Sequence, residues 1–155
     1  MTAITTAIDT RFGRLAVTEA GGAIVAATWS DQSHPGPATA LLRAAADQIA
    51  AYGRGELTRF DLPLRLSGSA FLVAVCKAML AIPQGETRTY GGIAADLGQP
   101  AQAIGRACGA NPIALIVPCH RVLGAGGRLT GYSGGDGVET KLALLRHEGG
   151  GGFLI

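Results

Sequence analysis

The spacing of apolar residues changes near Gly68, and this change limits the folds open to the chain. Before Gly68, three short β-rich runs are separated by turn residues and followed by one stripe of helical spacing. The runs are 3–8, 14–18 and 24–29, and the stripe is 38–52. Residues 60–66 read as one more strand or as an extended link. After Gly68 the spacing is helical in successive segments, so we predict an α/β fold with two domains, 1–66 and 67–155.

The second half of the sequence contains two short helical segments around a tight turn. Helical spacing covers 70–82, 90–97 and 101–110. The turn between the last two is Gly98-Gln99-Pro100, and two helices joined in this way have the shape of a helix-turn-helix. Taken alone this signal is weak, because many such helix pairs bind nothing. A last helix is predicted from 137 to 147, where Asp136 and Glu139 form a capping-box-like start.

Composition and charge exclude several classes of protein. With 155 residues, 48% of them hydrophobic, the chain can bury a core and is not expected to be disordered. No apolar run approaches the roughly 20 residues of a membrane helix, and the N-terminus lacks the pattern of a secretory signal. The net charge is +2, and this surplus lies in 67–155, which holds seven basic and five acidic side chains. Such a balance permits binding to a polyanion but does not require it.

Three cysteines are too few and too odd in number for a disulfide framework. We therefore expect a reducing, cytoplasmic location. Cys76 lies on the apolar stripe of its helix and Cys108 lies in a short helical segment, so both are interpreted as core residues. The histidines and cysteines show no C-x-x-C or H-x-x-x-H spacing, and no metal site is predicted.

Cys119 has the sequence setting of a reactive thiol. The apolar run 113–117 is predicted to be a buried strand that breaks at Pro118 and so presents the next side chain at a fixed place. A cysteine beside His120 has the two parts of an activated thiolate. Neighbours on an extended chain point to opposite sides, so the imidazole needs a water or a bend to reach the sulfur, and Glu148 is a candidate acceptor for its other nitrogen. A core cysteine beside a surface histidine explains the residue types equally well.

A second motif suggests a different enzyme class. Residues 131–135 match the G-x-S-x-G elbow of serine hydrolases, and His147 lies downstream. That elbow requires a buried strand before the serine and a helix directly after it. Residues 124–130 make a poor strand, and two glycines and Asp136 precede the helix. The chain is also short for the sheet of such an enzyme, so this interpretation is the weaker one.

Several further motifs appear in one order along the chain. The active-site segment is Pro118-Cys119-His120-Arg121-Val122, and Asn111-Pro112 precedes it. The other matches are Ile82-Pro83, Gly85-Glu86-Thr87-Arg88-Thr89-Tyr90-Gly91, Gly131-Tyr132-Ser133-Gly134-Gly135, Leu144-Leu145-Arg146-His147-Glu148, Phe12-Gly13-Arg14-Leu15 and Asp61-Leu62-Pro63-Leu64. Together they resemble the O6-alkylguanine-DNA alkyltransferases, also called methylated-DNA–protein-cysteine methyltransferases. The resemblance is dense over 67–149 and looser before it.

The resemblance implies both a fold and a reaction. A small N-terminal sheet-plus-helix domain of the ribonuclease-H-like kind would precede a mostly helical, winged helix-turn-helix domain. The reaction would be direct repair, in which one molecule irreversibly takes one alkyl group from O6-alkylguanine in double-stranded DNA onto Cys119. The protein would bind the minor groove as a monomer, without cofactor or membrane, and flip the damaged nucleotide out. Flipping agrees with the chemistry, because a stacked base cannot be attacked in line.

The resemblance also implies roles for single residues of the reaction. Cys119 would be the nucleophile, His120 its base through a bound water, and Glu148 the group that orients His120. Tyr90 would donate a proton to the leaving guanine, which must not depart as an unneutralised anion. Taken one at a time, each of these residues also has an ordinary structural explanation.

Substrate and DNA binding are implied in the same way. Ser133 would hydrogen-bond the guanine O6, and Tyr132 would line the pocket beside Gly131. The backbone carbonyls of Cys119 and Val122 would read the guanine amine. Asn111 would brace the turn before the active-site segment. The DNA-binding residues would be Thr89, Ala101, Gln102 and Arg106.

Two features depart from the family pattern. Many members carry an arginine in the second helix that enters the space left by the flipped base, and alignment on Asn111-Pro112 places Gln102 there. Either Gln102 fills that space, or Arg106, one helical turn further on, substitutes for it or supplements it. The connection after Gly135 is also slightly longer than in some members. A related class of non-repairing homologues lacks the cysteine, so Cys119 favours transfer over two alternatives, a module that only binds alkylated DNA and a hydrolase.

Overall fold

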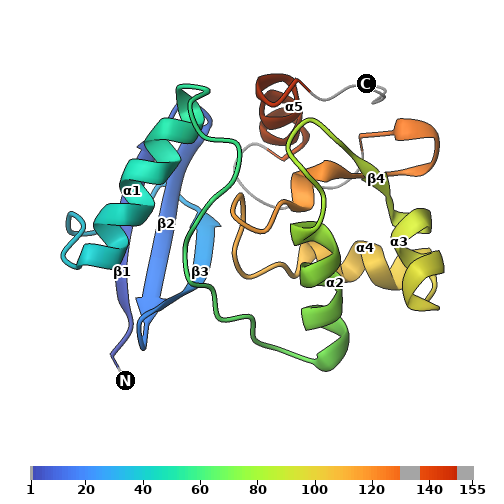
Figure 1. Ribbon diagram of the computed structural model, residues 1–155, viewed down its shortest axis with the longest axis horizontal. Coiled ribbons are helices and arrows are strands. Elements are labelled where there is room, and N and C mark those ends of the chain that lie inside the picture. The colour runs from blue at the N-terminus through green and yellow to red at the C-terminus, as the bar shows by residue number, and fades with distance from the viewer. Residues whose placement is uncertain (1, 130–136, 150–155) are drawn as a thin grey trace.

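The computed structural model describes residues 2–129 and 137–149, and it begins with a small antiparallel sheet (Figure 1). The sheet has the order β1-β2-β3. Its strands are β1 (Ile4–Thr10), β2 (Gly13–Ala20) and β3 (Ala23–Trp29), as the β-rich runs predict. Gly21 and Gly22 join β2 to β3 with φ angles of 58° and 80°, the left-handed conformation that a two-residue hairpin of this twist requires.

One helix covers this sheet, as Figure 1 shows. Helix α1 (Ala40–Gly53) begins at Thr39, whose side chain accepts a hydrogen bond from the Leu42 amide. Its buried residues are Leu42, Ala45, Ile49 and Tyr52, which follow the predicted stripe. The apolar face of α1 therefore packs against the sheet and brings Tyr52 to the end of the helix nearest the second half of the chain.

The outer edge of β3 joins the two halves of the chain. Of the two interpretations of 60–66, the extended link is correct, with one parallel bridge between Ile24 and Leu64. A second parallel bridge joins Ala27 to Ile113, where the Ala27 amide donates to the Pro112 carbonyl at 2.9 Å. The backbone groups of this edge are thus paired with segments from both halves, and the segment before the predicted nucleophile is fixed to the sheet.

Four helices and a small parallel pair of strands make up the rest of the described chain. The helices are α2 (Ala70–Leu80), α3 (Tyr90–Leu97), α4 (Ala101–Gly109) and α5 (Val138–His147). The pair consists of β4 (Arg88–Thr89) and β5 (Val122–Leu123), with 3₁₀ turns at η1 (Cys119–Arg121) and η2 (Ala125–Gly127). Gly98 ends α3 in the left-handed conformation, so α3 and α4 form the predicted pair around a tight turn.

Two local predictions are wrong. Residues 113–117 are buried except for the partly buried Ala114, but they form a turn, in which Leu115 has a φ of 70°, because only Ile113 pairs with the sheet. The last helix begins one residue later than a capping box at Asp136 requires. Its N-cap residue is Gly137, without a side-chain hydrogen bond, and Asp136 lies outside the described residues. Gly149 ends the helix in the left-handed conformation, as predicted.

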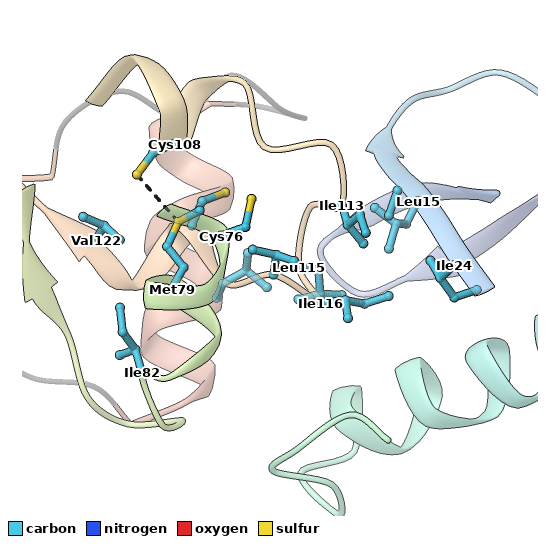
Figure 2. Packing of buried hydrophobic residues seen from close by; sticks show 14 of the residues in the cluster. Leu15, Ile24, Cys76, Met79, Ile82, Cys108, Ile113, Leu115, Ile116 and Val122 are labelled. Carbon is cyan, nitrogen blue, oxygen red and sulfur yellow. Dashed lines mark hydrogen bonds between the residues drawn. The ribbon is translucent and has the colours of Figure 1, made fainter. Parts of the chain in front are cut away.

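A continuous set of buried side chains connects the sheet with the helices. Figure 2 follows it from Leu15 and Ile24 in the sheet, through Ile113, Leu115 and Ile116, to Met79, Cys76 and Cys108 beside α2. The architecture is mixed α/β, as expected. Within 2–129 and 137–149, no helix has the length and apolar character to span a membrane.

Candidate active site

The turn before Cys119 is held at both ends by one side chain. Asn111 accepts a hydrogen bond from the Ile113 amide at 3.0 Å and donates to the Val117 carbonyl at 2.9 Å. The backbone closes the same turn, since the Val117 amide donates to the Ile113 carbonyl at 2.9 Å. Asn111 therefore braces the connection between α4 and the segment that holds Cys119, which is the role that the family resemblance implies for it.

Cys119 begins a 3₁₀ turn and is only 8% exposed. The Arg121 amide donates to the Pro118 carbonyl at 3.0 Å, which closes this turn. The expectation of an extended segment, with successive side chains on opposite sides, is therefore wrong. A 3₁₀ turn repeats every three residues, so Cys119, His120 and Arg121 leave the backbone in three directions. The backbone is therefore bent at this point, and whether the imidazole reaches the sulfur directly or through a water stays a prediction.

Glu148 is the centre of a buried hydrogen-bond network. Its Oε2 accepts from His120 Nε2 at 2.7 Å, from Tyr52 Oη at 2.6 Å and from Arg121 Nη2 at 3.1 Å. Its Oε1 accepts from Arg121 Nε at 2.8 Å. Burial alone would raise the pKa of Glu148, but the hydrogen bond from His120, the positive charge that His120 carries when protonated, and the hydrogen bonds from Arg121 and Tyr52 lower it to about 2. The side chain is thus a carboxylate at neutral pH.

His120 is oriented by this carboxylate and is fully buried. A carboxylate only accepts, so Nε2 carries the hydrogen and Nδ1 holds a free lone pair. Nδ1 is buried and has no hydrogen-bond partner within the described part of the chain. Burial lowers the pKa of His120, against the opposing effect of Glu148. The ring is therefore neutral at pH 7 and available as a base.

Lys141 is a buried cation that the sequence argument missed. Its side chain is fully buried on α5, and Nζ donates to the Val122 carbonyl at 2.6 Å and lies 5.7 Å from the centre of the Tyr90 ring. Burial lowers the pKa of Lys141 to about 8, while negative charge on Cys119 or Cys108 would raise it. A signal did exist, because Lys141 precedes the buried pair Leu144 and Leu145 by three and four residues.

The remaining thiols are core residues, as predicted. Cys76 and Cys108 are buried around Met79, and Cys108 Sγ donates to Met79 Sδ at 3.6 Å (Figure 2). Burial raises the pKa of the Cys108 thiol to about 12 and also raises the pKa of Cys76. Both therefore stay protonated at neutral pH and are poor nucleophiles.

The predicted DNA-binding residues lie at the start of α3 and on α4. Thr89 is the N-cap of α3, and its hydroxyl accepts from the Gly92 amide at 2.9 Å. Ala101, Gln102 and Arg106 are exposed on α4. Gln102 and Arg106 lie one turn apart, as predicted, and so share one exposed face of the helix.

The substrate residues are only partly described. Tyr90, the first residue of α3, is partly buried beside Lys141, and Val122 is fully buried. Gly131, Tyr132 and Ser133 lie outside the described residues. His147, the histidine of the hydrolase alternative, donates from Nε2 to the Tyr52 carbonyl at 2.6 Å. The described residues hold no group of three or more His, Cys, Asp or Glu that suits a metal ion.

A cavity of about 750 Å³ opens on another side of this network, between the link 58–64 and the end of α2. Pro118 and Arg121 line it, together with apolar residues of both halves, but Cys119 does not. We therefore assign the chemistry to the network around Glu148 and not to this cavity.

Comparison with known proteins gives one consistent result. Residues 70–150 match the family model "6-O-methylguanine DNA methyltransferase, DNA binding domain". A methylated-DNA–protein-cysteine methyltransferase of Mycobacterium tuberculosis is 53% identical over 119 residues, which is 76% of this chain and 71% of that protein. One from Methanosarcina acetivorans is 50% identical over 111 residues, 70% of each.

Solved structures agree along nearly the whole chain. The crystal structure of the M. tuberculosis O6-methylguanine methyltransferase has a TM-score of 0.85 and 44% identity, and the match covers 96% of this chain and 93% of that one. A crystal structure of the M. tuberculosis protein OGT in complex with DNA has a TM-score of 0.84 and 44% identity, over 94% and 92% of the chains. These structures share the small antiparallel sheet and the helices described above.

Proposed function

Since the chain belongs to the methylated-DNA–protein-cysteine methyltransferase family, it repairs alkylated DNA by moving the alkyl group onto a cysteine, and we propose that Cys119 is that cysteine. The observation that carries this proposal is the network behind it. His120, the residue next to Cys119, is neutral and buried, and the ionised Glu148 orients its ring. Its Nδ1 has no hydrogen-bond partner among the described residues. Cys76 and Cys108 lie instead in the apolar core around Met79.

The reaction is a single displacement at the alkyl carbon. His120 Nδ1 accepts the thiol proton of Cys119 through a bridging water, which a buried polar atom without a partner can hold. The thiolate sulfur then forms a bond to the alkyl carbon as the bond from that carbon to guanine O6 breaks. The electron pair of the broken bond goes to the guanine, and Tyr90 supplies the proton that neutralises it. The thioether is stable, so each molecule reacts once.

The buried charges support the charged species of this reaction. Once His120 has accepted a proton, Glu148 faces an imidazolium at 2.7 Å and stabilises it. Lys141 adds a positive charge that favours the thiolate of Cys119, and its Nζ donates to the Val122 carbonyl. Lys141 Nζ lies 5.7 Å from the centre of the Tyr90 ring, and a cation nearby favours a phenol that must give up a proton. Ser133 would hydrogen-bond the guanine O6, Tyr132 would line the pocket beside Gly131, and the carbonyls of Cys119 and Val122 would read the guanine amine.

DNA binding is assigned to α3 and α4 as a winged helix-turn-helix, with α4 in the minor groove. The β4-β5 pair supports this assignment, because it ties the N-cap residue of α3 to the strand that follows Cys119. Thr89, Ala101, Gln102 and Arg106 would contact the DNA, and Gln102 or Arg106 would hold the stack open after the O6-alkylguanine has flipped.

The N-terminal part, 1–66, is assigned as a ribonuclease-H-like domain, with the boundary before residue 67. The proposal further places a monomer in the cytoplasm, because an acceptor thiol must stay reduced to react. No cofactor is part of the reaction, since the thiol itself keeps the alkyl group.

The test is incubation with a duplex oligonucleotide that carries one O6-methylguanine, followed by intact-protein and peptide mass measurement. We expect a permanent gain of one methyl group on the Cys119 peptide and an equal loss of methylated base. Binding without mass gain would identify a binding module, and turnover of an ester substrate would identify a hydrolase. Unmethylated duplex of the same sequence is the control.

A further inference from the structure

One donor to Glu148 comes from outside the region that the family model matches. Tyr52 lies in the last turn of α1 and is 1% exposed. Its hydroxyl donates to Glu148 Oε2 at 2.6 Å, across 96 residues of sequence. The matched region is 70–150, so the N-terminal part of the chain reaches directly into the network that orients His120.

Tyr52 is fixed from several sides. Its backbone carbonyl accepts from His147 Nε2 at 2.6 Å, and its ring lies 4.9 Å from the His147 ring and 5.4 Å from the Phe60 ring, centre to centre. Because His147 directly precedes Glu148, the same tyrosine contacts two successive residues of the chain. Its backbone sets the end of α5, and its hydroxyl sets the carboxylate.

The hydroxyl shares one carboxylate oxygen with the histidine. Oε2 accepts from Tyr52 at 2.6 Å, from His120 at 2.7 Å and from Arg121 Nη2 at 3.1 Å, so three donors divide the charge of that oxygen and the bond from Tyr52 is the shortest. The first effect is geometric, because the carboxylate cannot rotate away from the imidazole without breaking a bond to a buried phenol. The second effect is electrostatic, because a carboxylate with an additional donor is a weaker base. The proton on Nε2 therefore stays on the imidazole during the reaction.

We propose that Tyr52 is a positioning residue for alkyl transfer, acting through Glu148 on His120. This inference rests on the proposed function. It predicts that the N-terminal part of the chain contributes to the rate of the reaction by one hydrogen bond, in addition to any contribution to stability.

The test is the isosteric variant Tyr52→Phe in a single-turnover assay with saturating methylated duplex. We expect transfer to be about tenfold slower, a change on the scale of one hydrogen bond to a charged group. DNA affinity should not change, because Tyr52 is buried on α1, whereas the residues assigned to DNA binding lie at the start of α3 and on α4. As the pH is lowered, the rate should begin to fall at a higher pH than in the wild type. Without the Tyr52 donor, Oε2 keeps more negative charge, and this charge stabilises the imidazolium form of His120, which cannot act as a base.

Two further variants separate positioning from folding. Phe60→Leu removes a ring that packs on Tyr52 but keeps the hydroxyl, and it should react at the wild-type rate once rates are corrected for the folded fraction. In a Glu148→Gln background, adding Tyr52→Phe should cause no further slowing, because the second change acts through the first. If Tyr52→Phe does not fold, 3,5-difluorotyrosine at position 52 keeps the ring, donates more strongly and should move the acid side of the profile downward.

The outcomes are distinguishable. A wild-type protein that gains no methyl group overturns the proposed function itself. A wild-type protein that reacts, with a Tyr52→Phe variant of equal rate and equal pH profile, overturns only the role of Tyr52. Additive slowing in the Glu148→Gln background also overturns it, because a structural role adds and a role through Glu148 does not.

Discussion

The two halves of the chain differ in where they bury charge. In the described residues up to 66 one charged side chain, Glu19, is buried, and it is still 9% exposed. In 70–149, His120, Arg121, Lys141 and Glu148 are all buried around the turn that holds Cys119. Burying charges costs free energy that apolar residues of similar size would not cost. The first half is thus built for stability with one side chain directed at the site, and the second half gives up stability for chemistry.

Removing the nucleophile from the second half should have the largest effect on methyl transfer. Cys119→Ser should abolish methyl transfer and leave binding to alkylated duplex nearly intact, since the hydroxyl keeps the shape but is almost never ionised at neutral pH. Mass measurement after incubation with methylated duplex, beside a binding titration, checks both parts. Methyl transfer by Cys119→Ser or Cys119→Ala would remove Cys119 from the centre of the mechanism.

Removing the buried carboxylate should have the next largest effect. Glu148→Gln should slow transfer by ~10²–10⁴-fold, the usual contribution of general-base assistance, because His120 loses its orienting acceptor and the imidazolium loses a counter-charge. Single-turnover rates at matched folded fraction are the measurement. A wild-type rate would reduce Glu148 to an ordinary residue at the end of a helix.

The exposed face of α4 should show a smaller effect that depends on the substrate. Gln102→Ala and Arg106→Ala are compared on duplex and single-stranded alkylated DNA, because a side chain that holds a stack open matters only where a stack exists. The residue that fills the space should slow duplex repair by several-fold more than single-strand repair. A residue that only contacts phosphate should weaken binding to all sequences alike. Equal losses on both substrates for both variants would show that neither Gln102 nor Arg106 holds the stack open.

A core change in the first half should have the smallest effect on the reaction. Ile49→Ala removes a buried side chain from α1 and should lower the free energy of unfolding by about 2–5 kcal/mol. Its transfer rate per folded molecule should equal the wild-type rate, because the apolar side chain of Ile49 cannot form a hydrogen bond with Glu148, His120 or Tyr52. Denaturant unfolding and single-turnover kinetics on the same samples measure both. A slow but fully folded variant would contradict the division of roles between the halves.

The sequence predicts the local elements well because their signals are local. The strands of the sheet follow from β-rich runs between turns, and α3 and α4 follow from helical spacing on either side of Gly98. Cys119, His120 and Glu148 could be assembled because a family pattern places them. The error at 113–117 has a tertiary cause, since an apolar run reads as a strand whether it pairs along its length or, as here, only at Ile113.

Tyr52 and Lys141 could not be found in the same way. Each lies on the apolar stripe of its helix, where a tyrosine or the stem of a lysine reads as core. What makes them different is the polar atom at the tip, and its partner lies in a distant part of the chain. Helical spacing predicts which face is buried, but it does not predict which other helix end or carbonyl that face meets.

The long-range character of the Glu148 network has a consequence for the newly made protein. The carboxylate joins His120, 28 residues before it, and Tyr52, 96 residues before it. No short segment of the nascent chain contains all three groups, and contacts between such distant residues form only as the whole fold closes. Before that moment Cys119 lacks its oriented base and behaves as an ordinary thiol among many in the cell. In a protein that can react only once, the acceptor Cys119 therefore stays weakly reactive until the complete DNA-binding fold has formed.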